Sequence, residues 1–376
     1  MTKVIRVLHS VAAMNMGGIE NFVMNLYRTV DRSKVQFDFL YAVDEDCFFD
    51  SEILSLGGRI FKIQSPNKHP FAAMKFYNRI FKDNPEIKVL HEHSSGLTGS
   101  LATFKSAKAA GITKRAIHSH SSATPLEGGL KGAVMRRNLD KNVTRIESLA
   151  TDFFACSDKA SEWMFPNATR HGIVTHIIKN GIDVNRFKFN EDERVRIREE
   201  LGIAPDTFVI GNVARLANVK NQTFLVRILK SLIEKIDAAL LLVGEGPLRN
   251  SIEVEANRLG ISDRVHLVGN QTDSAPFYSA MDLLCMPSLY EGLPCSCVEA
   301  QCNGLPLLLS DTVTRDASFT NNVVFQSLES GPEDWSDCAL SLKTSLADRA
   351  IGPFLTARAG FDINETADFL QNYYLE

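Results

Sequence analysis

Residues 287–300 have the sequence PSLYEGLPCSCVEA and follow a short apolar run, Met281–Met286. The Gly-Leu-Pro step predicts a turn and then a helix, because proline is favoured in the first helical turn. Glu291 then lies in the loop before the helix, and Glu299 lies about one and a half turns inside it. Free N–H groups at a helix N-terminus attract phosphate. The stretch is therefore typical of a strand–loop–helix unit of a parallel α/β sheet.

The same alternation of apolar strand, polar loop and helix recurs along the chain. Continuous apolar runs are typical of parallel strands that are buried on both faces. The segments expected as strands are residues 3–11, 35–43, 59–63, 87–92, 115–120, 152–155, 174–179, 208–213, 240–243, 264–268, 281–286 and, as the last strand, 305–309.

A highly charged stretch from Asn185 to Pro205 separates two such strand–helix series. The sequence therefore predicts an α/β protein with two Rossmann-like, doubly wound parallel-sheet domains. Their expected bounds are residues 1–183 and 184–357. A C-terminal helix within residues 358–376 is expected to return to the first domain.

The composition is that of a globular protein without a membrane-spanning helix. Of its 376 residues, 44% are hydrophobic, and no apolar run approaches the roughly 18 residues that a membrane crossing requires. Polar His9 and Ser10 interrupt the first apolar run, so a strand is expected there rather than a signal peptide. The seven cysteines show no C-x-x-C pair and are expected to be reduced thiols of a cytoplasmic protein.

The two halves of the chain differ in charge. Residues 1–180 contain 24 Lys and Arg against 17 Asp and Glu, whereas residues 181–376 contain 17 against 28. The basic half could meet an anionic acceptor or the inner face of the plasma membrane, or its charge could have no functional meaning.

Two His-x-His pairs end two of the predicted strands. His91 and His93 end one strand, and His118 and His120 end another. Residues two apart on a strand share a face, and ligands of open parallel sheets bind at the carboxyl ends of strands. The residues alone leave three alternatives open: a metal site, hydrogen-bonded structural histidines, or contact with a ligand. The acidic run 44–46 could likewise hold a metal, but a solvated loop is favoured.

Several loops that follow predicted strands carry groups suited to a nucleotide. Gly17 and Gly18 allow close approach of the backbone to a ligand. Arg215 and Lys220 offer a planar fork and a point charge, a combination suited to a diphosphate. A Gly-Glu-Gly-Pro turn follows residues 240–243 in the same domain.

Taken together, this set resembles the retaining glycosyltransferases of the GT-B fold, specifically family 4, in which two Rossmann-like domains face a cleft. Ala214 departs from the pattern, since the family often has glycine there. The segments around Gly17 and His120 look like those of members that build capsular, exopolysaccharide or O-antigen repeat units. The resemblance covers nearly the whole chain and rests on Gly17-Gly18, Asn180-Gly181-Ile182-Asp183, Arg215-Leu216 with Lys220, Gly244-Glu245-Gly246-Pro247-Leu248-Arg249, and residues 287–294 with Glu299.

For the second domain, the resemblance implies a donor site built from these loops. Arg215 and Lys220 would neutralise the donor diphosphate, and Glu299 would accept hydrogen bonds from the ribose hydroxyls. Glu291 would hold the donor sugar beside the reacting carbon. The further donor-binding residues that the resemblance implies are Gly244, Glu245, Gly292 and Leu293.

In the first domain, Gly17 and Gly18 would let the first loop pass over the diphosphate. A histidine at the end of the 115–120 strand would contact the donor sugar near the reaction centre, and His120 is preferred over His118. Domain closure over the donor would exclude water.

The resemblance implies metal-independent transfer of a hexose, without a cofactor, from a nucleotide sugar to a glycan or a polyprenyl-diphosphate-linked glycan. UDP is expected because it is the commonest donor nucleotide of the family. No nucleic-acid partner is expected, and the enzyme is placed in the cytoplasm or peripherally at the inner face of the plasma membrane. The alternatives are a glycoside hydrolase using the two glutamates, a nucleotide-sugar epimerase of the same fold, and a non-catalytic nucleotide- or glycan-binding subunit.

Overall fold

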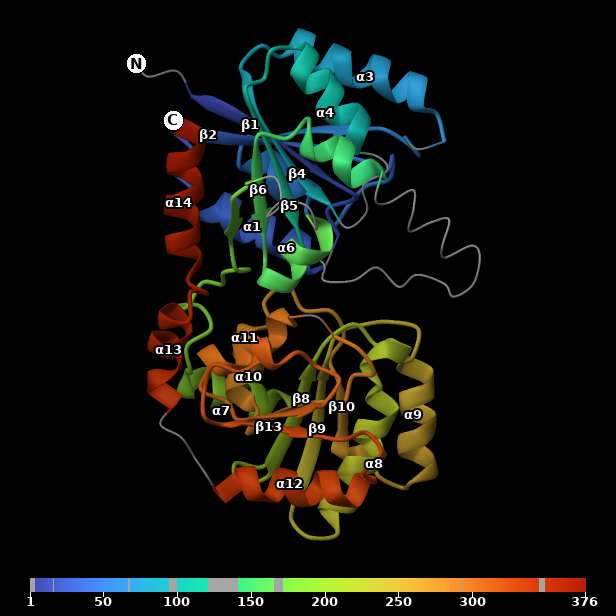
Figure 1. Cartoon of the computed structure of the whole chain (residues 1–376). Coiled ribbons are helices and arrows are strands. Elements are labelled where there is room, and N and C mark those ends of the chain that lie inside the picture. The colour runs from blue at the N-terminus through green and yellow to red at the C-terminus, as the bar shows by residue number, and fades with distance from the viewer. Residues whose placement is uncertain are drawn as a thin grey trace. The chain divides into compact units, whose positions relative to one another are not determined.

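The computed structural model describes residues 4–15, 17–66, 68–94, 100–120, 141–165, 172–291, 293–344 and 349–376. Its internal contacts divide the chain into two compact units, which Figure 1 shows in colours that follow the chain. The N-terminal unit comprises residues 1–181 together with 363–376, and the C-terminal unit comprises residues 182–362. The C-terminal segment that joins the N-terminal unit therefore starts at Ile363, inside the expected range 358–376.

The N-terminal unit contains one parallel sheet of seven strands in the order β3-β2-β1-β4-β5-β6-β7. This order places β1 beside β4, which are separated by two intervening strands in the sequence. The elements are β1 (Ile5–Val11), α1 (Gly18–Thr29), β2 (Val35–Tyr41), α2 (Asp50–Ser55), β3 (Arg59–Lys62), α3 (Pro70–Asp83), β4 (Ile87–Ser94), α4 (Ser100–Ala109), β5 (Lys114–Ser119), β6 (Asp152–Ala155), α6 (Asp158–Met164), β7 (Thr175–Ile177) and α14 (Ile363–Leu375).

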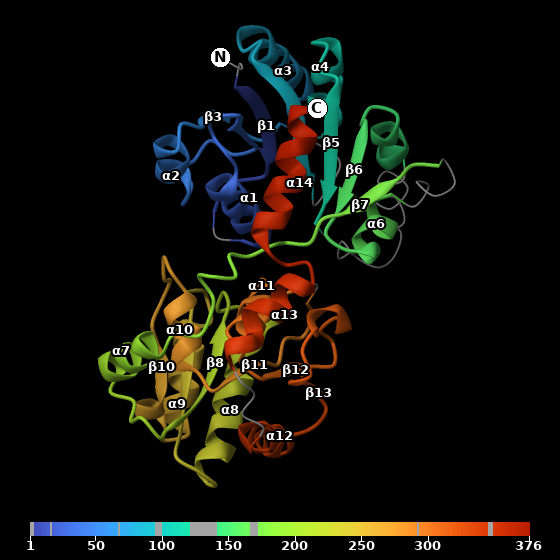
Figure 2. The same cartoon turned by 90° about the vertical axis from the view of Figure 1, so that its left-hand side faces the viewer.

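Helices cover both faces of this sheet, as a doubly wound fold requires. Apolar side chains of α1 and α14, such as Phe22 and Leu370, pack with Val7 and Val89 of the sheet. On the other face, α3 and α4 pack with the alternate strand residues, among them Leu90. Figure 2 shows α14 lying beside α1 along the sheet. The last helix is therefore part of the N-terminal unit's core.

The C-terminal unit repeats this topology with six parallel strands in the order β10-β9-β8-β11-β12-β13. Helices α10 and α11 cover one face, and helices α8, α9 and α12 cover the other. Its elements are α7 (Glu191–Leu201), β8 (Phe208–Val213), η2 (Asn218–Lys220), α8 (Gln222–Ile233), β9 (Ala238–Val243), α9 (Arg249–Arg258), η3 (Ser262–Arg264), β10 (Val265–Leu267), α10 (Ala275–Ala280), β11 (Leu283–Met286), α11 (Cys295–Cys302), β12 (Leu307–Ser310), η4 (Arg315–Ala317), β13 (Val323–Gln326), α12 (Pro332–Thr344), η5 (Arg349–Ile351) and α13 (Gly352–Arg358).

One strand prediction was wrong. The segment at residues 305–309 was expected to be the last strand, but β13 follows it and pairs with β12 at the sheet edge. Its length does not explain the omission, because other four-residue strands, such as β6 and β11, were predicted. None of the helices in the described ranges has both the length and the apolar composition needed to cross a bilayer.

In each sheet the chain first adds strands toward one edge and then adds the rest toward the other edge. This switch point lies between β1 and β4 in the N-terminal unit and between β8 and β11 in the C-terminal unit. The loops that leave neighbouring strands at such a point diverge to opposite faces of the sheet, which opens a space for a ligand.

Candidate active site

In the C-terminal unit, the loops after β8 and β11 are joined directly. The backbone N–H of Leu289 donates to the carbonyl oxygen of Val219 at 2.8 Å. The side-chain amide of Asn221 donates to the carbonyl oxygen of Pro287 at 3.1 Å. Residues that are about seventy positions apart in sequence thus form one rigid platform, because their strands are neighbours at the switch point.

Lys220 and Glu291 face each other on this platform. Lys220 ends the short helix η2, and its ammonium group donates a hydrogen bond to Oε1 of Glu291. The same carboxylate oxygen accepts a hydrogen bond from the hydroxyl of Ser288 at 3.1 Å, and Ser288 is fully buried. The Lys220–Glu291 pair is mostly buried, so solvent screens it less than a surface pair.

Glu299 has a different partner. Helix α11 begins at Cys295 with Pro294 at its N-cap, which places Glu299 in its second turn, as the sequence predicted. Oε2 of Glu299 accepts a hydrogen bond from the hydroxyl of Tyr278 at 2.5 Å. Burial raises the pKa of Glu299, and the hydrogen bond from Tyr278 acts in the opposite direction. The two carboxylates are therefore held separately, one by a cation and one by a phenol.

The remaining C-terminal residues from the sequence lie in adjacent loops. Arg215 is exposed, and within the described part of the chain its guanidinium has no hydrogen-bond partner. The guanidinium of Arg249 donates to Oε1 of Glu245 at 2.5 Å. Gly244 has φ of 136°, and a Cβ there would lie 2.1 Å from the carbonyl oxygen of Ala214. Close packing of the backbone is therefore sufficient to explain why this position requires glycine.

Two further pairs of predicted site residues precede helix α11 and begin helix α1. Gly292 lies outside the described residues, whereas Leu293 is half-buried and packs against the core of the C-terminal unit. In the N-terminal unit, Gly17 is the N-cap of α1 and Gly18 is its first residue. A Cβ on Gly18 would meet no atom within 4 Å, so protein packing does not require glycine at this position.

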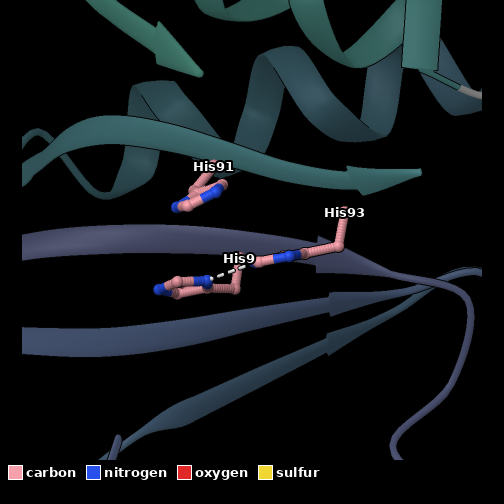
Figure 3. A group of neighbouring side chains, drawn as sticks. All are labelled: His9, His91 and His93. Atoms are coloured by element: carbon pink, nitrogen blue, oxygen red, sulfur yellow. Dashed lines mark hydrogen bonds between the residues drawn. The ribbon is translucent and has the colours of Figure 1, made fainter. Parts of the chain in front are cut away.

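Five histidines of the N-terminal unit form one cluster on the face of the sheet covered by α1 and α14: His9, His91, His93, His118 and His120. Nδ1 of His9 and Nε2 of His93 share a hydrogen bond of 2.9 Å, which Figure 3 shows as a dashed line. Nδ1 of His93 and Nε2 of His120 share another of 2.9 Å. The hydroxyl of Tyr374 in α14 lies 2.6 Å from Nδ1 of His91. The interpretation as hydrogen-bonded structural groups thus has support for His91, His93 and His120, whereas neither buried ring nitrogen of His118 has a hydrogen-bond partner within the described residues.

His9 was not recognised as a member of this cluster. It lies on β1 and shares a sheet face with Val7, opposite His91 in the register of the neighbouring strand. Its position near the carboxyl end of the first strand could have indicated this, had the strand order been known. His118 is fully buried, with its ring stacked at 4.0 Å on that of the half-buried His120. Of these two histidines, only His120 has some solvent exposure.

The cluster is uncharged at neutral pH. Burial lowers the pKa of His9 and of His120 to about 3, and holds the pKa values of His91, His93 and His118 well below their usual range. Neutral imidazoles each carry one N–H, which suits a chain of N–H···N hydrogen bonds.

One ring nitrogen each from His9, His91 and His93 lie within 4.8 Å of one another, and so do those of His93, His118 and His120. These distances would permit a metal ion. However, the nitrogens of His9 and His93 that face each other lie closer together than the roughly 3.3 Å expected across a tetrahedral zinc ion. The arrangement matches a hydrogen-bonded pair better than a pair of metal ligands.

Comparison with known proteins gives relatives for the whole chain. The family model described as "Glycosyl transferases group 1" matches residues 193–349. The putative glycosyltransferase EpsF of Bacillus subtilis (strain 168) is 35% identical over 379 residues, which cover 98% of this chain and 96% of the relative. An Escherichia coli protein named UDP-Gal:alpha-D-GlcNAc-diphosphoundecaprenol alpha-1,3-galactosyltransferase is 30% identical over 139 residues, or 36% of each chain.

Solved structures support the fold over the same length. Alr3699/HepE from Anabaena, determined in complex with UDP, matches with a TM-score of 0.77 at 18% identity over 98% of this chain and 99% of that protein. Sucrose-phosphate synthase from Thermosynechococcus elongatus matches with a TM-score of 0.72 at 16% identity over 98% of each chain. With the two parallel sheets described above, these matches confirm the predicted GT-B architecture of two Rossmann-like domains.

Proposed function

Because this chain belongs to the group 1 glycosyltransferases, we propose that it transfers a hexose from UDP-sugar to a glycan or a polyprenyl-diphosphate-linked glycan. We assign it to the retaining family 4 enzymes and to the assembly of a surface polysaccharide, such as exopolysaccharide or capsule. Two relatives support this proposal: the putative glycosyltransferase EpsF and the galactosyltransferase whose name specifies a UDP donor and a diphosphoundecaprenol-linked acceptor.

The observation that carries the proposal is the pairing of Lys220 with Glu291 beside the start of α11. A cation and a hydrogen-bond acceptor are thus positioned together, although the residues are far apart in sequence. A glycosyl donor needs both types of group, because its diphosphate is anionic and its sugar hydroxyls are donors. A hydrolase would use two carboxylates near one bond, whereas here one carboxylate binds Lys220 and the other binds Tyr278.

The proposed chemistry places positive charge where the leaving group develops negative charge. The bond between the sugar C1 and the diphosphate oxygen breaks, and its electron pair stays on the diphosphate. The acceptor hydroxyl oxygen forms the new bond to C1 on the same face, and its proton passes to the leaving diphosphate. Lys220, Arg215 and the N-terminus of α11 stabilise that diphosphate, whose charge is larger in the transition state than in the bound donor.

The other site residues have roles in the same proposal. Glu291 accepts hydrogen bonds from the donor sugar, with Gly292 and Leu293 beside it. Glu299 accepts hydrogen bonds from the ribose. The N-terminal unit contributes Gly17 and Gly18 near the diphosphate and a histidine near the sugar, and the burial of His118 favours His120 for that contact. Gly244 and Glu245 complete the donor-binding loops.

Transfer is proposed to need no divalent metal, since cationic side chains and a helix N-terminus serve the diphosphate. The test is activity after dialysis against EDTA, with and without added Mg²⁺ or Mn²⁺. Full activity in EDTA is expected, and a loss that added metal restores would overturn this part of the proposal.

The N-terminal unit is also proposed to contact the membrane that carries a lipid-linked acceptor. The surface of α3 and α4 exposes Phe71, which is 91% exposed, among basic side chains. Those exposed basic side chains are Lys68, Lys75, Arg79, Lys82, Lys105 and Lys108. Exposed aromatic groups among cations suit an anionic bilayer surface. Flotation with vesicles of phosphatidylglycerol and phosphatidylethanolamine, against vesicles of phosphatidylcholine alone, tests this contact.

The central experiment compares two variants in donor titrations and transfer kinetics. Glu291→Ala should lose turnover while keeping most of its UDP-sugar affinity, whereas Glu299→Ala should weaken donor binding. The reverse pattern would overturn the division of roles. Hydrolysis of nitrophenyl glycosides without nucleotide would favour a hydrolase, and conversion of UDP-sugar without an acceptor would favour an epimerase.

A further inference from the structure

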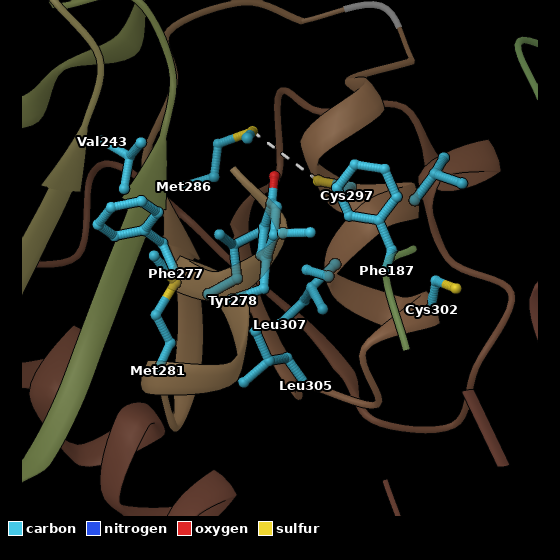
Figure 4. Close-up of a cluster of buried hydrophobic side chains, with 14 of the residues drawn as sticks. Phe187, Val243, Phe277, Tyr278, Met281, Met286, Cys297, Cys302, Leu305 and Leu307 are labelled. Atoms are coloured by element: carbon cyan, nitrogen blue, oxygen red, sulfur yellow. Dashed lines mark hydrogen bonds between the residues drawn. The ribbon is translucent and has the colours of Figure 1, made fainter. Parts of the chain in front are cut away.

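Tyr278 is a buried aromatic residue of the C-terminal unit whose hydroxyl has a carboxylate as its hydrogen-bond acceptor. It lies in α10, has no exposed surface, and contacts Phe187 edge-on at a ring distance of 5.9 Å. Figure 4 shows its ring among aliphatic and sulfur-containing side chains, with the hydroxyl on the side of Met286 and Cys297. The carbonyl oxygen of Tyr278 accepts a hydrogen bond of 3.0 Å from Arg349, which also fixes its backbone. The ring is therefore rigidly placed.

The hydroxyl is not needed to fill this space. A phenylalanine would occupy the same volume, and a buried hydroxyl costs free energy unless it is hydrogen-bonded. In this structure the hydroxyl donates to Oε2 of Glu299, a residue of the proposed donor site. The hydroxyl of Tyr278 is thus matched to one acceptor, the carboxylate of Glu299.

The hydrogen bond restricts the carboxylate of Glu299. Glu299 lies in α11 and Tyr278 lies in α10, and the two helices contact each other in the same core. With Oε2 bound to a rigid phenol, the carboxylate cannot rotate freely, and Oε1 keeps a defined direction. A vicinal diol needs such a fixed acceptor, because its two O–H groups have a set spacing and are also well solvated in water.

We propose that Tyr278 is a positioning residue that fixes Glu299 for the ribose diol of the donor nucleotide, and so sets the preference for ribonucleotides. This inference rests on the proposed function, in which Glu299 binds the ribose. Tyr278 itself does not touch the nucleotide. It acts through the orientation of the carboxylate, which makes its contribution depend on the ribose hydroxyls.

The test is a titration of wild-type protein and Tyr278→Phe with UDP and with 2′,3′-dideoxy-UDP, by calorimetry. For the wild type, we expect UDP to bind more tightly than the dideoxy nucleotide. For Tyr278→Phe, we expect the dissociation constant of UDP to rise about tenfold, as for loss of a hydrogen bond to a charged group. The dissociation constant of dideoxy-UDP should not change.

Two matched variants complete the design. Tyr27→Phe removes another buried hydroxyl, which donates to Gln36 at 2.7 Å in the N-terminal unit, and should leave both titrations unchanged. In a Glu299→Gln background, adding Tyr278→Phe should weaken UDP binding much less than it does in the wild type, because the carboxylate is already absent. This second comparison remains informative if Tyr278→Phe alone lowers the melting temperature.

Equal weakening of both nucleotides by Tyr278→Phe, or no weakening of UDP, would overturn the role of Tyr278. Failure of the proposed function looks different. If the wild type binds neither UDP nor GDP, the donor proposal is wrong, and if it binds UDP and dideoxy-UDP equally well, the assignment of Glu299 to the ribose is wrong.

Discussion

The two units have the same strand order around their switch points but place their polar groups differently. In the N-terminal unit, four histidines lie on the strands themselves and His120 directly follows β5, and burial keeps all five neutral. In the C-terminal unit, Lys220 and Glu291 lie in loops beyond the strand ends and are paired as charges. The same topology thus supports a neutral cluster in one unit and a charged one in the other.

The difference shows that enclosure by the covering helices decides what a polar side chain near a strand end can do. A group on the strand is enclosed by helices, where an unpaired charge is costly, so imidazoles there lose their protons and bond to one another. A group one turn further along reaches solvent and can remain charged for an anionic ligand.

The N-terminal unit should lose stability steeply in acid. Its five clustered histidines have pKa values lowered by burial, so the unfolded chain takes up protons below about pH 6.5 that the folded unit does not. Stability is therefore full above that pH and falls as pH decreases toward the lowered values. Each histidine contributes about 1.4 kcal/mol of unfolding free energy per pH unit.

The two tryptophans separate the units in this experiment. Trp163 lies in α6 of the N-terminal unit, and Trp335 lies in α12 of the C-terminal unit. Trp335→Phe leaves a reporter of the first unit, and Trp163→Phe leaves a reporter of the second. Thermal melts between about pH 7.5 and 5 should show a larger fall for the first reporter, and equal falls would contradict the neutrality of the cluster.

The second prediction concerns the charged cluster. Lys220→Met should lower kcat about 10²- to 10³-fold, as expected when a group that stabilises developing charge is lost. Lys230→Met is a matched control, because Lys230 forms an exposed pair with Glu234 one turn away on α8. Transfer rates at saturating donor measure the effect. If both variants retain wild-type kcat, Lys220 does not act on the leaving group.

Much of the charged cluster was predictable from sequence, whereas little of the neutral one was. Loops after strands carry short local motifs, so Lys220, Glu291 and Glu299 could be placed before any contact was known. The partner of Glu299 could not, because Tyr278 belongs to a different helix and its hydroxyl direction depends on core packing. His9 was not recognised for a similar reason, because it lies beside His93 only as a result of the pairing of β1 with β4.

The strand pattern itself was largely recovered, because parallel strands buried on both faces are continuous apolar runs. The exception, β13, is a four-residue edge strand with half-buried residues. It pairs with β12 in parallel register. Edge position and partial burial do not by themselves hide a strand, because the edge strands β3 and β10 are also half-buried and were predicted.

The third prediction tests whether the first loop meets a ligand. A Cβ at Gly18 has open space, so Gly18→Ala should keep or raise the melting temperature, because alanine favours the helix more than glycine. If the diphosphate passes this backbone, the added methyl group should raise the donor KM about tenfold, or about 1.4 kcal/mol. Gly331→Ala, also with open space around its Cβ, is the control. An unchanged KM in both would remove Gly18 from the donor site.

The fourth prediction, with the smallest expected effect, concerns Tyr374→Phe. This substitution should change stability, whereas the same substitution at Tyr278 should change nucleotide binding. Tyr374 is buried in α14, and its hydroxyl bonds to His91 in the neutral cluster. Losing that bond should cost about 1 kcal/mol of unfolding free energy, read from denaturant melts of the Trp335→Phe protein. Nucleotide dissociation constants should not move, because neither Tyr374 nor His91 is among the residues proposed to contact the nucleotide. A weakening of UDP binding by Tyr374→Phe as large as that by Tyr278→Phe would erase this distinction between the two units.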